Sequence, residues 1–125
     1  MSKYANSVQA NLDLAAHGTA ADNTNLAAAC IVPAGKEIEI YNLQSFITTG
    51  SGASDTIELV RSDDATTPLC DVDINTTGVN ESSASFPIVV SNTGSSDIAL
   101  VFRSNGALGS PVGSVIAHFS KPAIT

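Results

Sequence analysis

The sequence contains no tryptophan, and two tyrosines and four phenylalanines are its only aromatic residues. A hydrophobic core must therefore be built mainly from Val, Ile, Leu and Ala. Sugar-binding β proteins commonly stack ligands on exposed aromatic rings, whereas the strand positions of the four phenylalanines predict that all of them pack in the core: Phe46, Phe86, Phe102 and Phe119. Only Tyr4 and Tyr41 then remain as rings outside the predicted core. A lectin-like site would accordingly have to use the loops.

Basic residues are also scarce, since five Lys and Arg oppose twelve Asp and Glu and give a formal net charge of -7. Nucleic-acid binding requires clustered cations that displace counterions from phosphates. Here the five cations are scattered singly along the chain. We therefore expect no nucleic-acid partner and no anionic membrane surface, and an acidic protein of this kind favours a basic protein partner.

The chain lacks any apolar run near the ~20 residues needed to span a bilayer, and residues 1–8 lack the apolar segment of a signal peptide. We therefore expect synthesis and assembly in a cytoplasm. In that reducing compartment the two cysteines, Cys30 and Cys70, are predicted to be buried thiols rather than a disulfide.

Residues for catalysis are few. Only His17 and His118 offer an imidazole base, and we assign His17 to a loop and His118 to the outer face of a strand. The sequence has no Gly-x-Ser-x-Gly elbow, and Gly50-Ser-Gly52 lacks the third glycine of a dinucleotide fingerprint. We predict no catalytic residues, no cofactor and no enzymatic activity.

One motif places oxygen ligands on alternate residues, namely Asp71-Val-Asp73-Ile-Asn75. Calcium prefers such sets, but an EF-hand loop would need Gly where Thr76 stands and Glu where Ser82 stands. Because Val72 and Ile74 alternate with the polar positions, the motif is more typical of an ordinary strand with one solvated face. We predict no metal site here.

Eight short runs of alternating or β-branched apolar residues fill the chain, with Gly, Asn, Asp, Ser and Thr between them. Period-two alternation is typical of strands with one buried face. The expected strands are Val8–Ala16, Leu26–Val32, Glu37–Thr49, Thr56–Arg61, Cys70–Ile74, Phe86–Val90, Asp97–Arg103 and Ser114–Phe119.

The connections carry their own signals. Pro33-Ala34-Gly35 predicts a turn that leads directly into Glu37. The apolar parity shifts between Ile40 and Leu43, which predicts a bulge or a segment covered on both faces. Pro87 cannot donate to a strand ladder and therefore predicts an edge strand or a bulge. Residues 75–82 are expected to form a polar loop.

Eight strands with turn chemistry between them, and no long segment of helical period, predict an all-β fold. The expected architecture is an eight-stranded antiparallel β-sandwich or jelly roll. A chain of 125 residues fits one domain, residues 1–125. The extended segment 1–7 has too little apolar content to pack on its own domain, and we expect it to reach a neighbouring subunit.

One part of the chain resembles the small jelly-roll or β-sandwich decoration (cement) proteins of tailed bacteriophage heads. It is the stretch Ile31-Val-Pro-Ala-Gly-Lys-Glu-Ile-Glu-Ile40, followed by a Thr/Gly-rich loop and another amphipathic strand. The resemblance implies a virion structural protein on the capsid exterior, made in the host cytoplasm. It implies binding to the major capsid protein, often as trimers at symmetry axes, and reinforcement of the lattice against DNA pressure. The family carries no shared functional residues to transfer.

Two alternatives stay open. The first is a receptor-binding or carbohydrate-binding sandwich, such as a head-fibre or tail-fibre tip, in which loop residues including Asn80, Glu81 and Asn105 would bind the ligand. The second is a small bacterial adhesin or lectin-like module. Both are binding proteins rather than enzymes.

Overall fold

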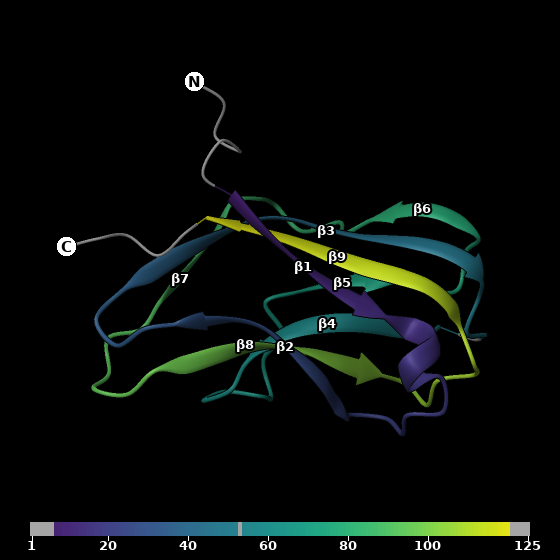
Figure 1. Ribbon diagram of the computed structural model, residues 1–125, viewed down its shortest axis with the longest axis horizontal. Coiled ribbons are helices and arrows are strands. Elements are labelled where there is room, and N and C mark those ends of the chain that lie inside the picture. Colours follow the sequence, from purple (N-terminus) through teal and green to yellow (C-terminus); the bar gives the residue numbers. More distant parts are fainter. Residues whose placement is uncertain (1–6, 53, 121–125) are drawn as a thin grey trace.

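The computed structural model describes residues 7–52 and 54–120, which form two layers of antiparallel strands (Figure 1). These residues contain nine strands and one 3₁₀ helix. In chain order they are β1 (Ser7–Asp13), η2 (Leu14–His17), β2 (Asn25–Val32), β3 (Glu37–Thr49), β4 (Thr56–Arg61), β5 (Cys70–Asp73), β6 (Gly78–Glu81), β7 (Ile88–Ser91), β8 (Ile98–Asn105) and β9 (Val112–Ser120). The predicted all-β class and sandwich of two antiparallel sheets are confirmed.

The two sheets are built from nested strand pairs. Sheet A has the order β1-β9-β3, and both β6 and β7 pair with the far edge of β3. Sheet B has the order β2-β8-β4-β5. The first strand thus pairs with the last, the second with the eighth, the third with β6 and β7, and the fourth with the fifth.

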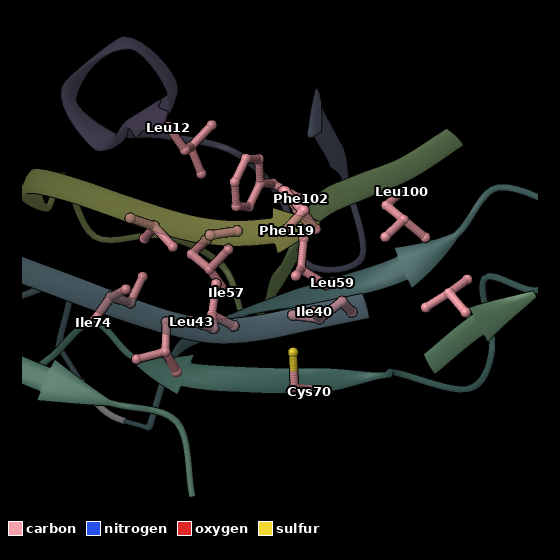
Figure 2. Packing of buried hydrophobic residues seen from close by; sticks show 14 of the residues in the cluster. Leu12, Ile40, Leu43, Ile57, Leu59, Cys70, Ile74, Leu100, Phe102 and Phe119 are labelled. Atoms are coloured by element: carbon pink, nitrogen blue, oxygen red, sulfur yellow. The ribbon is translucent and has the colours of Figure 1, made fainter. Parts of the chain in front are cut away.

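The core lies between the sheets (Figure 2). Sheet A contributes side chains such as Ile40 and Leu43, and sheet B contributes Ile57 and Leu100, all fully buried. Burying one such side chain contributes about 1.5–3 kcal/mol. Of the phenylalanines predicted to lie in the core, Phe102 and Phe119 are 1% and 0% exposed, and the half-buried Phe86 packs against the core.

The predicted parity shift in β3 is confirmed. Its pairing with β9 slips between Ile40 and Asn42, so the inward positions change from Ile38 and Ile40 to Leu43, Ser45 and Ile47. Because Phe46 falls on the outward parity after this bulge, it is 37% exposed. The prediction that Phe46 packs in the core was wrong, and Phe86, half-buried, precedes β7 rather than lying in it.

Two local predictions also need correction. The first strand ends at Asp13 rather than at Ala16, because the Asp13 carboxylate accepts a hydrogen bond from the Ala15 amide at 3.2 Å and η2 then buries Leu14. The expected loop 75–82 contains the short strand β6. The count is therefore nine strands instead of eight, with β6 and β7 sharing one edge of β3.

The other turn and edge predictions are confirmed. The Lys36 amide donates to the Pro33 carbonyl at 3.1 Å, and Gly35 has a φ of 75°. β7, which follows Pro87, pairs only with β3 and is an edge strand. Of the extended segment expected at residues 1–7, residues 1–6 lie outside the described part of the chain, and Ser7 begins β1.

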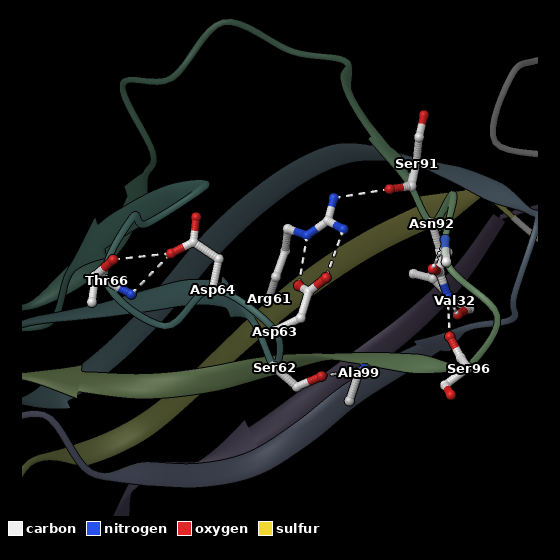
Figure 3. Close-up of polar contacts among 11 residues, drawn as sticks. Val32, Arg61, Ser62, Asp63, Asp64, Thr66, Ser91, Asn92, Ser96 and Ala99 are labelled. Carbon is white, nitrogen blue, oxygen red and sulfur yellow. Dashed lines mark hydrogen bonds and ion pairs between the residues drawn. The ribbon is translucent and has the colours of Figure 1, made fainter.

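Polar contacts join the two sheets at one end of the sandwich (Figure 3). Arg61, at the end of β4, donates to the Ser91 carbonyl of β7 at 2.9 Å and forms a two-bonded ion pair with Asp63. The buried Asn92 amide donates to the carbonyls of Val32 and Ser96 at 2.9 and 2.8 Å. These bonds fix sheet B against the β3–β7 edge of sheet A.

The two cysteines are free thiols, as predicted, but only Cys70 is buried and Cys30 is half-buried. They lie on β2 and β5, the opposite edges of sheet B. Three strand spacings, about 14 Å, separate these edges, so the two thiols of one chain do not pair.

Candidate functional site

The outer face of sheet A carries an apolar patch. Phe46 of β3 is the direct cross-strand partner of Val79 on β6, and it pairs with Ser114 on β9. On β9, Ile116 occupies the diagonal position, within reach of an aromatic ring. Val112 lies on the other side of Ser114, after a register shift that places it opposite Thr49. Val79 is 63% and Val112 43% exposed. We call these four residues the Phe46 patch.

Acidic side chains lie on the same face as the patch, on the outward parity of three strands. Glu81 and Asp13 flank the patch, because Glu81 is opposite Gln44 and Asp13 is opposite Ser114. Glu37 and Glu39 lie toward the other end of β3. Glu81 accepts a hydrogen bond from Gln44 at 2.9 Å, and Glu37 accepts one from Ser91 at 3.1 Å. The five strands of sheet A contain no Lys or Arg. This face therefore carries an apolar patch toward the β6 edge and acidic side chains of one charge sign.

The outer face of sheet B is covered in its middle. Val60 and Val101 point outward on paired strands, yet they are only 1% and 8% exposed. The segment 62–69 folds back over them, with the Ala65 carbonyl accepting a hydrogen bond from the Arg103 guanidinium. Beneath it Glu58 is buried, and burial raises the pKa of its carboxyl against the opposing effect of Arg103. Of the two sheet faces, that of sheet A is the one that the described residues leave open.

A pocket of about 520 Å³ lies at the end of the sandwich where η2 meets the loop before β9. Backbone hydrogen bonds join the loop after η2 to the loop before β9. The Ser110 N–H donates to the Gly18 carbonyl at 2.7 Å, and the Leu108 N–H donates to the Ala20 carbonyl at 2.9 Å. The lining mixes small apolar groups with hydroxyls, an amide and the His17 imidazole, and has no carboxylate, Lys or Arg: Ala15, Ala16, His17, Gly18, Thr19, Ala20, Thr24, Asn25, Leu26, Ser110, Pro111 and Val112. Such a pocket suits a neutral polar group.

The two histidines considered for catalysis are not brought together. His118 lies on β9 opposite Gln9, with 2.9 Å between their Nε2 atoms. His17 ends η2, beyond the other end of β1, and lines the end pocket.

The residues of the Asp71-Asp73-Asn75 motif end a strand. Asp71 is exposed. Both carboxylate oxygens of Asp73 accept local hydrogen bonds, one from the Asn75 backbone N–H at 2.7 Å and one from the Thr76 hydroxyl at 2.6 Å. These bonds, that from Thr76 above all, lower the pKa of the Asp73 carboxyl. In residues 7–52 and 54–120, no three His, Cys, Asp or Glu side chains gather as metal ligands.

The loop residues named for ligand binding do not form one site. Asn80 and Glu81 lie on β6 in sheet A, whereas Asn105 ends β8 in sheet B. The Asn80 amide is engaged inside the fold, since it donates to Ser45 Oγ at 3.1 Å and to the Thr76 carbonyl at 2.7 Å. Tyr41 is half-buried and has a contact of its own, and Tyr4 lies outside the described residues.

The Phe46 patch was not predicted from the sequence. Its signal was the adjacent pair Phe46-Ile47, of which only one can face the core of a half-buried strand, and an isolated Val79 in a polar stretch.

The part of the chain that the structure describes has no helix of the length and apolarity needed to cross a bilayer. Comparison with known proteins found no matching family model, curated protein or solved structure.

Proposed function

We propose that the protein is a virion structural protein that decorates and stabilises a bacteriophage capsid, and that the outer face of sheet A binds the major capsid protein. The observation that carries this proposal is the exposed Phe46 patch within an acidic sheet face. Apolar anchors surrounded by a polar rim are the usual anatomy of protein interfaces. The rim here carries one sign of charge, so the complementary lattice surface is basic around an apolar centre.

The fold assignment within this proposal is a jelly roll. It is supported by the nested strand pairs, from β1 with β9 down to β4 with β5, since such nesting results when one long antiparallel pair is rolled into two sheets. The shared edge of β3 then counts as one strand position occupied by β6 and β7. This arrangement gives a rigid body with one broad open face.

The test is sedimentation of the purified chain with phage heads from the source of this sequence. Heads stripped of their decoration should bind the chain to saturation at a fixed ratio to the capsid protein, and the refilled heads should resist heat better than stripped heads. A chain that stays in the supernatant, or that is found only in tails, would contradict the proposal.

A second candidate function is favoured by the end pocket. Its volume is within the range of small-ligand sites, and its neutral hydroxyl and amide lining suits a sugar or another uncharged polar group of a receptor. A glycan array and host-cell binding measurements test this candidate. Saturable binding that is lost in His17→Ala supports it, and a clean array together with no cell binding rejects it.

A further inference from the structure

The edge strand β1 is regular along its whole length. Its register with β9 runs through seven consecutive residue pairs, from Ser7 to Asp13, without a shift. On its other side no strand among residues 7–52 and 54–120 pairs with it. The neighbouring edge strand β2 differs, because its pairing with β8 slips twice, at Asn25/Ala27 and at Ala28/Cys30. Bulges of this kind protect an edge from pairing with other chains.

Within residues 7–13, β1 lacks three of the usual protective devices, namely Lys, Pro and a bulge, and its one charged side chain, Asp13, stands at its last position. It also leaves an apolar side chain uncovered. Val8 shares the inward parity of Ala10 and Leu12, yet it is 39% exposed whereas Leu12 is 1% exposed. An added strand beside β1 would cover Val8 and satisfy the free backbone groups of this edge.

We propose that β1 pairs antiparallel with β1 of a second copy of the chain, with the two-fold axis at Ala10. The two copies of sheet A then form one continuous sheet across the dimer. This is an isologous contact, in which the same strand serves both subunits and the assembly closes at two copies.

The strand is self-complementary in this register. On the inward side Val8 meets Leu12 of the second copy, and the small Ala10 lies at the axis. On the outward side Gln9 faces Asn11 of the second copy, and both positions are exposed in the single chain. A slip of one residue would place Val8 opposite polar side chains.

Charge also favours this register. Asp13 of each copy lies at the far end of the paired strands, so the two carboxylates are about 20 Å apart at the usual rise per residue, well beyond the screening length at physiological salt. Registers displaced toward the C-terminal end of β1 bring these like charges closer together. The match is between the two ends of β1 itself, so a second copy is the occupant that the sequence of β1 fits.

The dimer leaves the Phe46 patch open, because the patch is centred on β3 and β6 at the opposite edge of sheet A. The pairing does not depend on the proposed capsid function. If both hold, each dimer presents two patches and gains avidity on a lattice whose sites it spans. A two-fold pair also differs from the trimer that the resemblance implies, so the mass in solution distinguishes the two.

The test is sedimentation equilibrium of the full chain and of two double variants that differ at one position. In Gln9→Lys/Asn11→Glu, each Lys faces a Glu of the second copy. In Gln9→Lys/Asn11→Lys, each Lys faces a Lys. Both variants lose the Gln9–His118 contact equally, so they form a matched pair. Circular dichroism and thermal unfolding check that both fold.

We expect the natural chain to be a dimer. The Lys/Glu variant should dimerise roughly tenfold more tightly than the Lys/Lys variant, given two cross-strand pairs that change from attraction to repulsion, and this difference should shrink in high salt. A monomeric or trimeric natural chain, or equal dimer affinities for two folded variants, would overturn the proposal.

Discussion

Phe46 of β3 and Val79 of β6 are direct cross-strand partners, and the bulge between Ile40 and Asn42 turns this pair toward solvent rather than into the core. The double substitution Phe46→Ser/Val79→Ser therefore removes the apolar centre of the open sheet face without opening a cavity. We expect capsid affinity to fall at least about tenfold, the effect of losing a central apolar anchor, while stability changes by about 1 kcal/mol or less.

The control is Ile31→Ser, which removes a 51% exposed side chain from the outer face of sheet B. It should leave capsid binding unchanged in the same sedimentation measurement. Equal losses in the two variants would show that general surface apolarity, and not the Phe46 patch, is responsible.

Gly113 is required by a close approach of two strands. Its φ is 145°, and a Cβ there would lie 2.1 Å from the Phe46 carbonyl oxygen. We expect Gly113→Ala to destabilise the fold by at least about 2 kcal/mol in denaturant unfolding. Gly94→Ala is the matched substitution, because a Cβ at position 94 meets only Asn92 Oδ1 at 3.4 Å. Similar midpoints for the two variants would contradict the strand geometry.

Asn92 is 3% exposed and its amide joins β2 to the loop before β8. In Asn92→Ala the buried Val32 carbonyl loses its amide donor, which costs about 1–3 kcal/mol. Asn105→Ala removes the same chemical group at an exposed position and should be near neutral. Thermal unfolding of the pair gives the comparison, and a neutral Asn92→Ala would show that the two carbonyls find other donors.

Burial raises the pKa of the Cys70 thiol to about 12 and that of Cys30 to about 11. The folded chain therefore holds both protons at pH 8, and we expect a thiol-specific reagent to react slowly with the native protein and rapidly with the unfolded one. Fast reaction of both thiols in the native state would contradict their placement in sheet B.

The same raised pKa values make stability depend on alkaline pH. Above the unfolded thiol pKa of 9.0 the folded state binds more protons than the unfolded state, so the free energy of unfolding falls as pH rises from about 9 toward 11 or 12. Cys70→Ala should lose less stability over this interval than the natural chain. A steeper fall of the free energy of unfolding in Cys70→Ala would contradict the raised pKa of the Cys70 thiol.

The sequence predicted the strands whose alternation is continuous. β4 and β8 carry apolar residues at every inward position from Ile57 to Leu59 and from Ile98 to Phe102, and both lie within two residues of the predicted bounds. β6 was assigned to a loop, since Val79 is its sole large apolar residue and faces outward. Period-two arguments detect strands through their buried face, and β6 buries almost nothing of its own.

The site was harder to predict than the fold. The parity shift after Ile40 was visible in the sequence, but Phe46 and Ile47 are adjacent and equally apolar, so the position of the bulge decides which one faces the core. The coverage of sheet B by residues 62–69 is a tertiary contact, through Arg103 and Ala65, that no local pattern encodes. The open face of the sandwich could therefore be identified only from the structure.

A cryo-electron microscopy reconstruction of heads decorated with this chain shows directly which face of the protein binds the lattice. We predict that the outer face of sheet A, with Phe46 and Val79, lies against the capsid protein while the segment 62–69 over sheet B faces solvent. Density that places sheet B or the end pocket on the lattice, or the absence of this chain from the heads, would contradict it.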